Sequence, residues 1–542
     1  MDDLDEQNGE GELSALDRVI ERLNELEDST DVEAVRKIVR GFIRQLGLSE
    51  VAMLEDHLRS QTGLSQRAVY ALTKESRNYV EGFGYLNSAK DIVDALWRDL
   101  TTNHEAVVCS GTGVFLYEAS AGTDEEKVSS SETTGFFQSH SLEQVERHML
   151  ELFDGVPALE SKRVRQEVLT QLRMRCEEAK FFLDAPPGVN VRNGFVRLDE
   201  AGELRLVPHS PAHKARMRIE ADYDAEADIG WLEEAISRTL PDKAAREALQ
   251  EVAGAILFNV RPAKDAVRCM YIMHGARNSG KSTIINMLTE LLPSEVVASV
   301  SPKHWGDPNY RAALENVQLN VVTELGGNTQ IGGEEMKKIV SWEPTIIRRM
   351  RRDPVSITLM ARHLFATNEL PRIVDKSDAF ERRLLVISFP HSLEDSKVDG
   401  NFSEKLKANP SAILRWAAVG AARLIRNGRF TLPPGHAMAA AEMRFGSDLP
   451  LLFAHTQVRQ ASGGRITTAD LRDAMKAFWR ERGQDPEKIH DGDIRKVVDV
   501  MQHRDGATRH KSNGKPFYQG VSIVSHTPAQ AEGPEDVDLE DL

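Results

Sequence analysis

The feature that most constrains this chain is an eight-residue loop, Gly-Ala-Arg-Asn-Ser-Gly-Lys-Ser, at positions 275–282. The loop fits the pattern G-x-x-x-x-G-K-[ST] without a mismatch. The apolar stretch 269–273 before it predicts a buried strand, and 282–292 after it predicts an amphipathic helix. A chance glycine-rich turn would not bring both flanking elements with it. The order of strand, glycine-rich loop and helix therefore predicts an α/β domain built around this loop.

Each part of this loop has a physical role in holding phosphate. The glycines let the backbone curl so that successive N–H groups point at phosphate oxygens, at a helix N-terminus that favours anions. We expect Lys281 to reach the β- and γ-phosphates of ATP, and the Ser282 hydroxyl to bind Mg²⁺. The predicted nucleotide-binding residues are Gly275, Ala276, Arg277, Asn278, Ser279, Gly280, Lys281, Ser282 and Thr283.

Two polar residues end later apolar strands. The stretch 319–324 ends in Glu324, and the stretch 364–368 ends in Asn368. A carboxylate at the C-terminal end of the neighbouring strand can hold Mg²⁺ or orient the attacking water. The Asn368 amide can bind the γ-phosphate or that water. The alternative for Glu324 is a surface carboxylate after a buried strand.

An arginine pair, Arg382 and Arg383, precedes the apolar strand 384–387. Such a pair can point across a subunit boundary and act as an arginine finger on the ATP of a neighbouring subunit. The alternative is a surface ion pair with Asp378 or Glu381. Beside a complete set of phosphate-binding residues, we favour the finger.

A basic hairpin is predicted between Glu324 and Asn368. Residues 345–350 and 355–358 are predicted strands, joined by Arg-Arg-Asp-Pro at 351–354. Several arginines near one tip, against a single Asp, suit the phosphate backbone of DNA. The alternative is a solvated basic hairpin with no ligand. The predicted DNA-binding residues are Lys338, Arg348, Arg349, Arg351 and Arg352.

The composition and net charge limit which domain organisations and functions remain possible. At about 150 residues per domain, 542 residues suggest three or four domains. A hydrophobic fraction of 41% and a charged fraction of 28% exclude global disorder. The segments 1–12 and 529–542 hold twelve acidic residues and no basic one, so a net charge of −16 leaves −4 for the body. Because acidic tails are usually solvated, the overall acidity does not exclude a local nucleic-acid site.

Targeting signals and cysteines point to the cytoplasm. No apolar stretch approaches the ~20 residues that cross a bilayer, and the acidic N-terminus lacks the features of a signal peptide. Cys109, Cys176 and Cys269 are far apart and odd in number, which argues against a disulfide framework or a zinc site. We therefore expect a cytoplasmic protein with no membrane partner.

Patterns before the loop predict two further regions. Residues 13–85 show helical spacing of apolar residues, and 62–69 resemble the turn and Ser-capped helix of a helix-turn-helix unit. We favour a plain helical packing unit there over a contact with DNA. Residues 86–230 are mixed α+β, with a hairpin around Gly111 and a short sheet within 189–207.

Residues 1–230 offer little support for catalysis of their own. Asp222 and Asp224 have the spacing of a metal-binding pair, but we favour a polar connector. No pair of catalytic carboxylates in strand context is recognised before residue 230. We therefore do not predict primer synthesis by this chain.

These motifs, in this order and spacing, resemble the superfamily 3 helicases of viruses, phages and plasmids. The greatest similarity is to the poxvirus D5-like and phage or plasmid primase-associated branch. The resemblance covers most of the chain. Residues 193–224 resemble the end of the branch's N-terminal region, 265–390 its ATPase core, 413–420 its helical subdomain and 465–525 its winged helix.

The resemblance assigns a role to each candidate residue. The loop 275–282 is motif A, Glu324 lies in motif B, Asn368 is sensor 1 and Arg383 is the arginine finger, with Arg382 beside it. The basic hairpin stands where the family has its pore loop.

This sequence departs from the family pattern at two places. Motif B usually ends in two acids, whereas Thr323 occupies the first position here. The family usually has a Lys and a glycine-rich turn before sensor 1, whereas Lys337-Lys338 is followed here by Ser-Trp-Glu-Pro at 341–344.

The resemblance implies an α/β, AAA+-type P-loop ATPase core with a mixed α+β N-terminal region and a C-terminal winged-helix DNA-binding domain. Helical patterns at 468–482 and 490–502, followed by a glycine-rich hairpin at 506–524, agree with the last of these. The expected boundaries are 1–12 and 528–542 for the acidic tails, 13–85 for the helical segment, 86–230 for the mixed region, 231–450 for the ATPase and 451–527 for the winged helix.

The resemblance also implies a function. We expect an ATP- and Mg²⁺-dependent replicative DNA helicase of a phage or mobile element, located in the cytoplasm of a bacterial host. It would form a hexameric ring that moves 3′ to 5′ on single-stranded DNA and unwinds forked DNA, with a separate primase or replication initiator as a partner. One alternative is a non-unwinding, DNA-dependent ring ATPase that acts as an initiator or a defence or remodelling factor. A small-molecule kinase is a third class, which the basic hairpin and arginine pair argue against.

Overall fold

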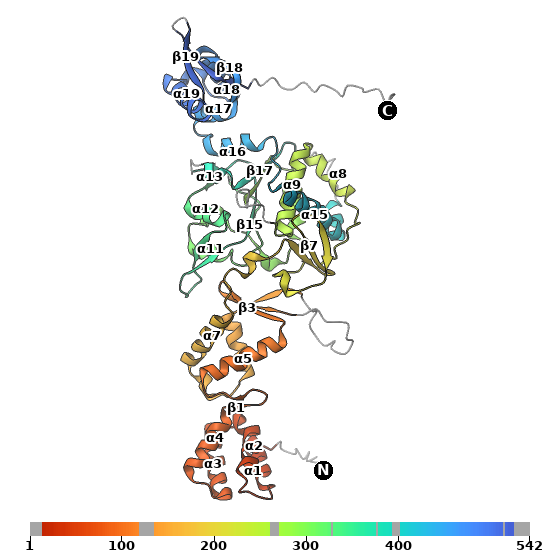
Figure 1. The fold of residues 1–542 in the computed structure, drawn as a ribbon, viewed down its shortest axis with the longest axis vertical. Coiled ribbons are helices and arrows are strands. Elements are labelled where there is room, and N and C mark those ends of the chain that lie inside the picture. Colours follow the sequence, from red (N-terminus) through yellow and green to blue (C-terminus); the bar gives the residue numbers. More distant parts are fainter. Residues whose placement is uncertain are drawn as a thin grey trace, which may run out of the picture. The chain divides into compact units, whose positions relative to one another are not determined.

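The computed structural model is an α/β structure that contains a parallel sheet and many helices (Figure 1). It describes residues 13–118, 135–260, 270–326, 329–374, 378–392, 401–512 and 515–524. The predicted acidic tails and Cys269 lie outside these residues. Within them, no helix has the length and apolar character needed to span a membrane.

The chain divides into two compact units. Unit 1 comprises residues 1–186, 190–195 and 207–218, and unit 2 comprises 187–189, 196–206 and 219–542. The short antiparallel sheet expected within 189–207 is observed, and its strands contribute to both units. Its strands are β6 (Gly188–Val191), β7 (Gly194–Leu198) and β8 (Leu204–Val207).

Unit 1 begins with the predicted helices, which pack around one apolar core. The helices are α1 (Ala15–Asn24), α2 (Val32–Phe42), α3 (Leu48–Thr62) and α4 (Gln66–Arg77). Ser14 starts α1 with a reciprocal cap, because its hydroxyl accepts from Asp17 N at 3.1 Å while Asp17 Oδ2 accepts from Ser14 N at 3.3 Å. Val19, Val39 and Leu54, from three of these helices, are fully buried in the core.

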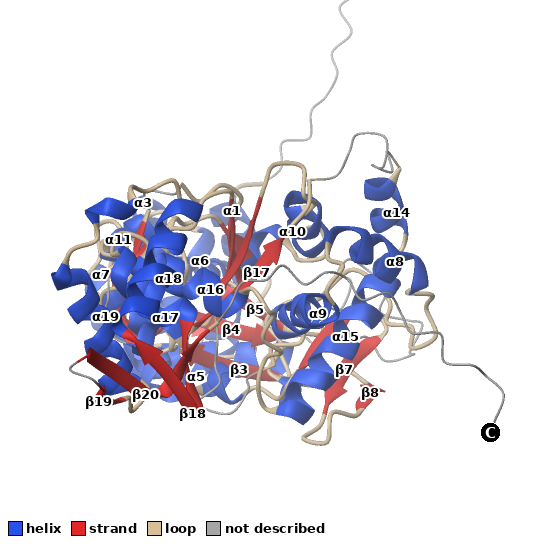
Figure 2. Ribbon diagram, turned by 90° about the horizontal axis from the view of Figure 1, so that it is seen from above, coloured by secondary structure: helices blue, strands red, loops and turns tan. Residues whose placement is uncertain are grey.

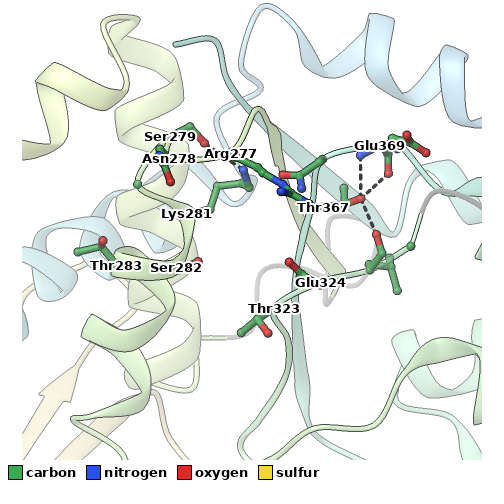
Figure 3. Close-up of a pocket in the computed structure, with 14 residues that line it drawn as sticks. Arg277, Asn278, Ser279, Lys281, Ser282, Thr283, Thr323, Glu324, Thr367 and Glu369 are labelled. Atoms are coloured by element: carbon green, nitrogen blue, oxygen red, sulfur yellow. Dashed lines mark hydrogen bonds between the residues drawn. The ribbon is translucent and has the colours of Figure 1, made fainter. Parts of the chain in front are cut away.

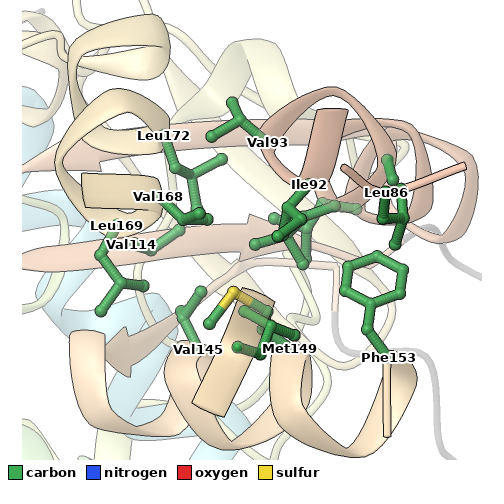
Figure 4. Close-up of a cluster of buried hydrophobic side chains, with 14 of the residues drawn as sticks. Leu86, Ile92, Val93, Val114, Val145, Met149, Phe153, Val168, Leu169 and Leu172 are labelled. Carbon is green, nitrogen blue, oxygen red and sulfur yellow. The ribbon is translucent and has the colours of Figure 1, made fainter. Parts of the chain in front are cut away.

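A second core of unit 1 lies between helices and an antiparallel sheet (Figure 4). Its elements are β1 (Tyr79–Val80), β2 (Gly84–Tyr85), α5 (Ala89–Asn103), β3 (Ala106–Ser110), β4 (Gly113–Tyr117), β5 (Phe137–Ser141), α6 (Leu142–Leu152) and α7 (Lys162–Cys176). The predicted hairpin is observed as β3 and β4, which pair Ser110 with Gly113. Ile92, Met149 and Leu172 bring α5, α6 and α7 together in the core.

Two of the cysteines lie in contact in this second core. The Sγ atoms of Cys109 and Cys176 are 2.6 Å apart, and both thiols are free and buried. The hydrogen bond to Cys176, together with burial, raises the pKa of the Cys109 thiol. The pair is 67 residues apart in the sequence and meets because β3 packs against α7. Both thiols are free, in agreement with the argument against a disulfide framework.

Unit 2 contains a five-stranded parallel sheet in the order β10-β11-β15-β9-β17. The strands are β9 (Met270–Gly275), β10 (Val297–Ala298), β11 (Leu319–Val322), β15 (Arg362–Thr367) and β17 (Leu384–Phe389). The central β9 is buried on both faces, where Tyr271 and Ile272 are at most 1% exposed. Because all five strands are parallel, their carboxyl ends lie along one edge of the sheet.

Shorter elements surround this sheet. The helices are α10 (Lys281–Thr289), α11 (Pro308–Ala312), α12 (Glu334–Val340), α13 (Asp378–Glu381) and α16 (His436–Phe445). Two further sheets are a parallel pair, β12 (Gln330–Ile331) with β16 (Arg372–Ile373), and an antiparallel pair, β13 (Pro344–Ile347) with β14 (Val355–Thr358). The antiparallel pair is the predicted basic hairpin.

Helices α9 and α15 lie side by side in unit 2 (Figure 2). The helices of this part are α8 (Gly230–Thr239), α9 (Lys243–Leu257), α14 (Phe402–Ala408) and α15 (Pro410–Asn427). Their backbones approach closely at two glycines. A Cβ added to Gly420 would overlap the Gln250 carbonyl oxygen, and one added to Gly254 would overlap the backbone of Ala421. Glycine at these positions is what allows the close crossing.

Replacing Gly420 by alanine should destabilise unit 2 by roughly 3 kcal/mol, because the clash is with backbone that cannot rotate away. Gly492→Ala is the matched control, since nothing lies within 4 Å of a Cβ added there. Thermal unfolding followed by circular dichroism measures both variants. A Gly420→Ala melting temperature equal to that of Gly492→Ala would show that α9 and α15 do not pack as described.

The C-terminal part of unit 2 joins three helices to an antiparallel sheet. Its elements are α17 (Leu449–Gln457), β18 (Val458–Thr467), α18 (Thr468–Glu481), α19 (Asp491–Arg504), β19 (Thr508–Ser512) and β20 (Lys515–Ile523). The two expected helices and the expected hairpin are observed as α18, α19 and β19–β20. The sequence pattern missed β18, which pairs with β20 and gives the sheet order β18-β20-β19.

Candidate nucleotide-binding site and basic hairpin

The glycine-rich loop connects β9 to α10, as its sequence predicts. Gly275 ends β9 against β17, where a Cβ would overlap the Phe389 carbonyl oxygen. Gly280 has a φ of +88°, and Asn278 a φ of +56°. Left-handed backbone at these positions favours glycine and asparagine, and it turns the chain into the first turn of α10.

Lys281 is the first residue of α10, and its ammonium lies inside the curl of the loop. Its Nζ donates to the carbonyl oxygens of Gly275 at 2.8 Å and Ala276 at 2.6 Å, and to Ser279 Oγ at 3.0 Å. The residue is only 7% exposed. Burial lowers the pKa of Lys281, because desolvation disfavours the charged form. The loop carbonyls and the Ser279 hydroxyl solvate the charge in place of water.

The loop borders a cavity of about 820 Å³ at the carboxyl edge of the parallel sheet (Figure 3). Three segments line it, namely the loop with the start of α10, the residues after β11, and the residues at the end of β15. The lining residues are Arg277, Asn278, Ser279, Gly280, Lys281, Ser282, Thr283, Thr323, Glu324, Leu325, Gly326, Thr367, Asn368 and Glu369. The cavity thus collects seven of the nine predicted nucleotide-binding residues, together with Glu324 and Asn368.

Glu324 reaches this cavity from a strand that does not neighbour β9. The sheet order places β15 between β9 and β11, so the expectation of a neighbouring strand is wrong. Glu324 and Thr323 follow the end of β11 and are exposed to the cavity side. Asn368 follows β15, which is the strand that does neighbour β9. The intervening strand therefore separates the loop from the carboxylate.

Thr367 ties the ends of β11 and β15 together, a role that the sequence analysis missed. Its hydroxyl donates to the Leu325 carbonyl at 2.7 Å and accepts from the Glu369 backbone N–H at 3.2 Å. The Leu325 backbone N–H donates in turn to the Ala366 carbonyl at 2.8 Å. The polar run Thr-Asn-Glu at the end of an apolar strand is the sequence signal that could have identified this role of Thr367.

Next to the loop, His274 faces the same side of the sheet as Thr367, its partner on β15. Burial and the charge of Lys281 lower the pKa of His274. The imidazole is therefore neutral at neutral pH, unlike the side chain of Lys281.

The arginine pair does not join the cavity of its own chain. Arg382 and Arg383 precede the first residue of β17, whereas the loop lies level with its last residue, Phe389. Six residues of strand correspond to roughly 20 Å. Arg383 is half-buried and its Nε donates to the Ser341 hydroxyl, while Arg382 is exposed. Glu381 forms an ion pair with Arg444, whose Nη1 lies 3.4 Å from its Oε2.

The basic hairpin has the predicted strands, with a longer tip than expected. β13 ends at Ile347, which pairs with Val355, so Arg348 and Arg349 belong to the tip. Arg348 and Arg351 are exposed. Met350 between them is 85% exposed. The tip therefore presents positive charge on either side of one apolar side chain.

Two of the predicted DNA-binding residues are engaged within the chain. Arg349 binds Glu315, with its Nη2 2.6 Å and its Nε 3.1 Å from Oε2. Lys338 lies on α12, where its ammonium is 2.9 Å from Glu334 and 3.0 Å from Glu335. These partners offset both positive charges, whereas Arg348 and Arg351 are exposed at the tip.

An aromatic ring beside the hairpin was not predicted. Tyr310 on α11 is 48% exposed and stacks on His304, with ring centroids 4.4 Å apart. The Arg348 backbone N–H donates to the Pro308 carbonyl at 3.0 Å, which attaches the hairpin to the same short helix. A lone tyrosine in a polar segment gives no sequence signal for this placement.

Asp222 and Asp224 accept hydrogen bonds within the chain. The Asp222 carbonyl accepts from the Ser411 hydroxyl at 2.7 Å, and the Asp224 carboxylate accepts from Glu226 N at 2.8 Å. In the part of the chain that the structure describes, no three His, Cys, Asp or Glu side chains are grouped to hold a metal ion. The interpretation of this segment as a polar connector agrees with these contacts.

The fold and the cavity define an α/β chain with a glycine-rich loop, a carboxylate and an amide at the carboxyl edge of a parallel sheet. Residues 273–383 match the model of a family of unknown function, DUF5906. One solved structure of the NrS-1 C-terminal region, an A-form apo structure, is similar over 79% of this chain and 98% of that chain, with 11% identity and a TM-score of 0.39. An apo structure of NrS-1 residues 305–718 is similar over 78% of this chain and 97% of that chain, with 13% identity and a TM-score of 0.38.

Proposed function

We propose that this chain is an ATP- and Mg²⁺-dependent DNA helicase of a phage or mobile element, which works as a hexameric ring with an AAA+-type core. The observation that carries the proposal is the cavity that joins the glycine-rich loop to Glu324 and Asn368. A basic hairpin in the same unit supplies a surface suited to single-stranded DNA. The C-terminal helices and three-stranded sheet are the set of secondary-structure elements expected of a winged helix.

The residues around the cavity fit a nucleotide with its metal ion. The left-handed backbone at Asn278 and Gly280 curls the loop, as is needed for its N–H groups to face phosphate oxygens. Ser282 and Glu324 line the same cavity, and Mg²⁺ is usually held by a hydroxyl or one or two carboxylates together with substrate phosphates. When bound, the metal ion would neutralise the charge that develops on the phosphates.

Each residue then has a role, and Glu324 has two, as a metal partner and as the base. Lys281 offsets negative charge on the phosphates, and Ser282 holds the metal ion. Glu324 accepts the proton of the attacking water, because Thr323 leaves it as the single carboxylate after β11. Asn368 orients that water or the γ-phosphate, on a backbone that Thr367 holds against the end of β11.

A buried arginine links the hairpin to the core. Arg311 on α11 is 4% exposed, and its Nε donates to the Ile346 carbonyl on β13 at 2.8 Å. Its Nη1 lies 3.5 Å from Glu335 on α12, which also accepts from the Thr345 hydroxyl at 2.7 Å. Because these bonds tie β13 to α11 and α12, we propose that movement of these helices during the ATP cycle moves the hairpin tip.

The placement of Arg383 supports the proposed ring. Its side chain lies roughly 20 Å along β17 from the loop of its own chain, so it can serve an ATP only in a second copy. A ring of such copies would place one finger at every ATP and direct the hairpin tips toward one channel. Arg348 and Arg351 would contact phosphates there, and Tyr310 would stack on bases.

Hydrolysis of ATP by the full chain, with and without single-stranded DNA, tests the proposal. We expect Mg²⁺-dependent turnover that DNA stimulates. Glu324→Gln should still bind a fluorescent ATP analogue but hydrolyse ATP at least about a hundredfold more slowly, because an amide cannot accept the proton.

Glu290→Gln is the matched control, because Glu290 is an exposed acidic residue at the C-cap position of α10, at the end of the helix away from the loop. It should hydrolyse ATP at the parental rate. Parental turnover by Glu324→Gln would assign the base to another carboxylate, and the absence of any turnover by the parental chain would contradict the proposal.

A further inference from the structure

Helices α3 and α4 of unit 1 form a helix-turn-helix whose outer face is not used by the proposed helicase (Figure 1). We propose that this face binds duplex DNA, with the N-terminal half of α4 in the major groove. The proposal does not rest on ATP hydrolysis or on the basic hairpin. It reverses the preference for a plain packing unit that the sequence alone supports.

The turn between the two helices has the local features that fix such a unit. It is three residues long, from Gly63 to Ser65. Gly63 ends α3 in the left-handed region, with a φ of 68°. Ser65 starts α4, with its hydroxyl accepting from Ala68 N at 3.3 Å. Leu64 between them packs against the helical core, so the turn is anchored rather than solvated.

The inner faces of the two helices hold α4 in place. Leu54 and Leu58 of α3 and Val69 and Leu72 of α4 are at most 3% exposed and belong to one core. This packing leaves the opposite face of α4 outward. A rigid recognition helix is what readout of base edges in the major groove requires.

The outward face of α4 carries groups that suit DNA. Gln66, Arg67, Tyr70 and Lys74 are all exposed, and their spacing places them on one side of the helix. Tyr70, between them, is 57% exposed. Glutamine can bind adenine and arginine can bind guanine through paired hydrogen bonds, while lysine contacts phosphate.

Nearby carboxylates do not oppose this positive face. Glu55 on α3 accepts from the Thr73 hydroxyl at 2.6 Å. Glu75 on α4 faces α2, where it lies 3.7 Å from Arg36. The outward face is therefore positive without an acidic residue. Lysine is depleted in protein–protein interfaces, so Lys74 favours DNA over a protein partner at this face.

Binding of the full chain to a labelled duplex of mixed sequence, about 30 base pairs long, tests the proposal across a salt series. We expect Arg67→Ala with Lys74→Ala to weaken duplex binding at least about tenfold. The slope of log K against log salt should become shallower by about 0.9, since Lys74 no longer neutralises a phosphate. Binding to a single strand of the same length, and ATP hydrolysis, should keep their parental values.

Arg22→Ala with Lys37→Ala is the matched control, because it removes two exposed charges from α1 and α2 of the same helical core. It should bind the duplex like the parental chain. Circular dichroism melting establishes that both double variants are folded, as expected for exposed positions. Equal loss in both variants, or parental binding by the α4 variant, would overturn the proposal. Parental duplex binding by the α4 variant would indicate that this face binds a protein partner instead of DNA.

Selection of duplexes from a random library by the full chain tests whether bases are read. Gln66→Ala should relax the preference at one position of the selected sequence, without changing the salt slope. A parental pool with no sequence preference would overturn the placement of α4 in the major groove.

Discussion

Lys281→Ala should reduce ATP hydrolysis by at least about a thousandfold. The ammonium lies inside the loop, bonded to two carbonyls and the Ser279 hydroxyl, at the position from which it meets phosphate. Its loss removes the positive charge that the loop directs at the transferred phosphoryl group. Single-turnover hydrolysis of labelled ATP by the full chain measures the effect.

Lys243→Ala is the matched control, because Lys243 is also the first residue of a helix, α9, is exposed and does not line the cavity. It should hydrolyse ATP at the parental rate. If Lys281→Ala hydrolyses ATP within tenfold of the parental rate, the loop does not take part in catalysis.

Mixing Lys281→Ala with Arg383→Ala should restore ATP hydrolysis that neither variant shows alone. Each variant lacks one of the two groups, so mixed assemblies contain interfaces at which an intact loop meets an intact finger. A finger is worth about 10³–10⁵ in rate, so even a minority of restored interfaces would exceed the background. The rate across mixing ratios, with co-assembly shown by cross-linking, is the measurement.

Ser341→Ala separates a finger from a structural role of Arg383. It removes the hydrogen bond between the two side chains but keeps the guanidinium. If Arg383 acts on a neighbour's ATP, Ser341→Ala should hydrolyse ATP far better than Arg383→Ala. Equal loss in both variants, or no recovery on mixing of co-assembled variants, would contradict a shared site.

Local features of this chain were predictable from sequence. The loop 275–282 is contiguous, and its glycines, lysine and serine define their own backbone and the start of α10. Glu324 and Asn368 were found because each ends an apolar strand, and parallel strands bring such ends to one edge. The hairpin of β13 and β14 follows from two short strands close in sequence.

Features that depend on distant partners were not predictable. The insertion of β15 between β9 and β11 is a pairing of strands, which no single stretch of sequence encodes. The neutralisation of Arg349 depends on Glu315, which is 34 residues away. Spacing likewise could not show that Arg383 lies at the opposite end of β17 from the loop.

Displacement of a labelled strand from a forked duplex tests the central claim most directly. With ATP and Mg²⁺ the full chain should release the strand, and Lys281→Ala should not. Arg348→Ala with Arg351→Ala should hydrolyse ATP without DNA at the parental rate but release little strand, because the hairpin no longer grips phosphates. ATP hydrolysis stimulated by DNA, with no strand released from forks of either polarity, would contradict a helicase and show a ring ATPase that does not unwind.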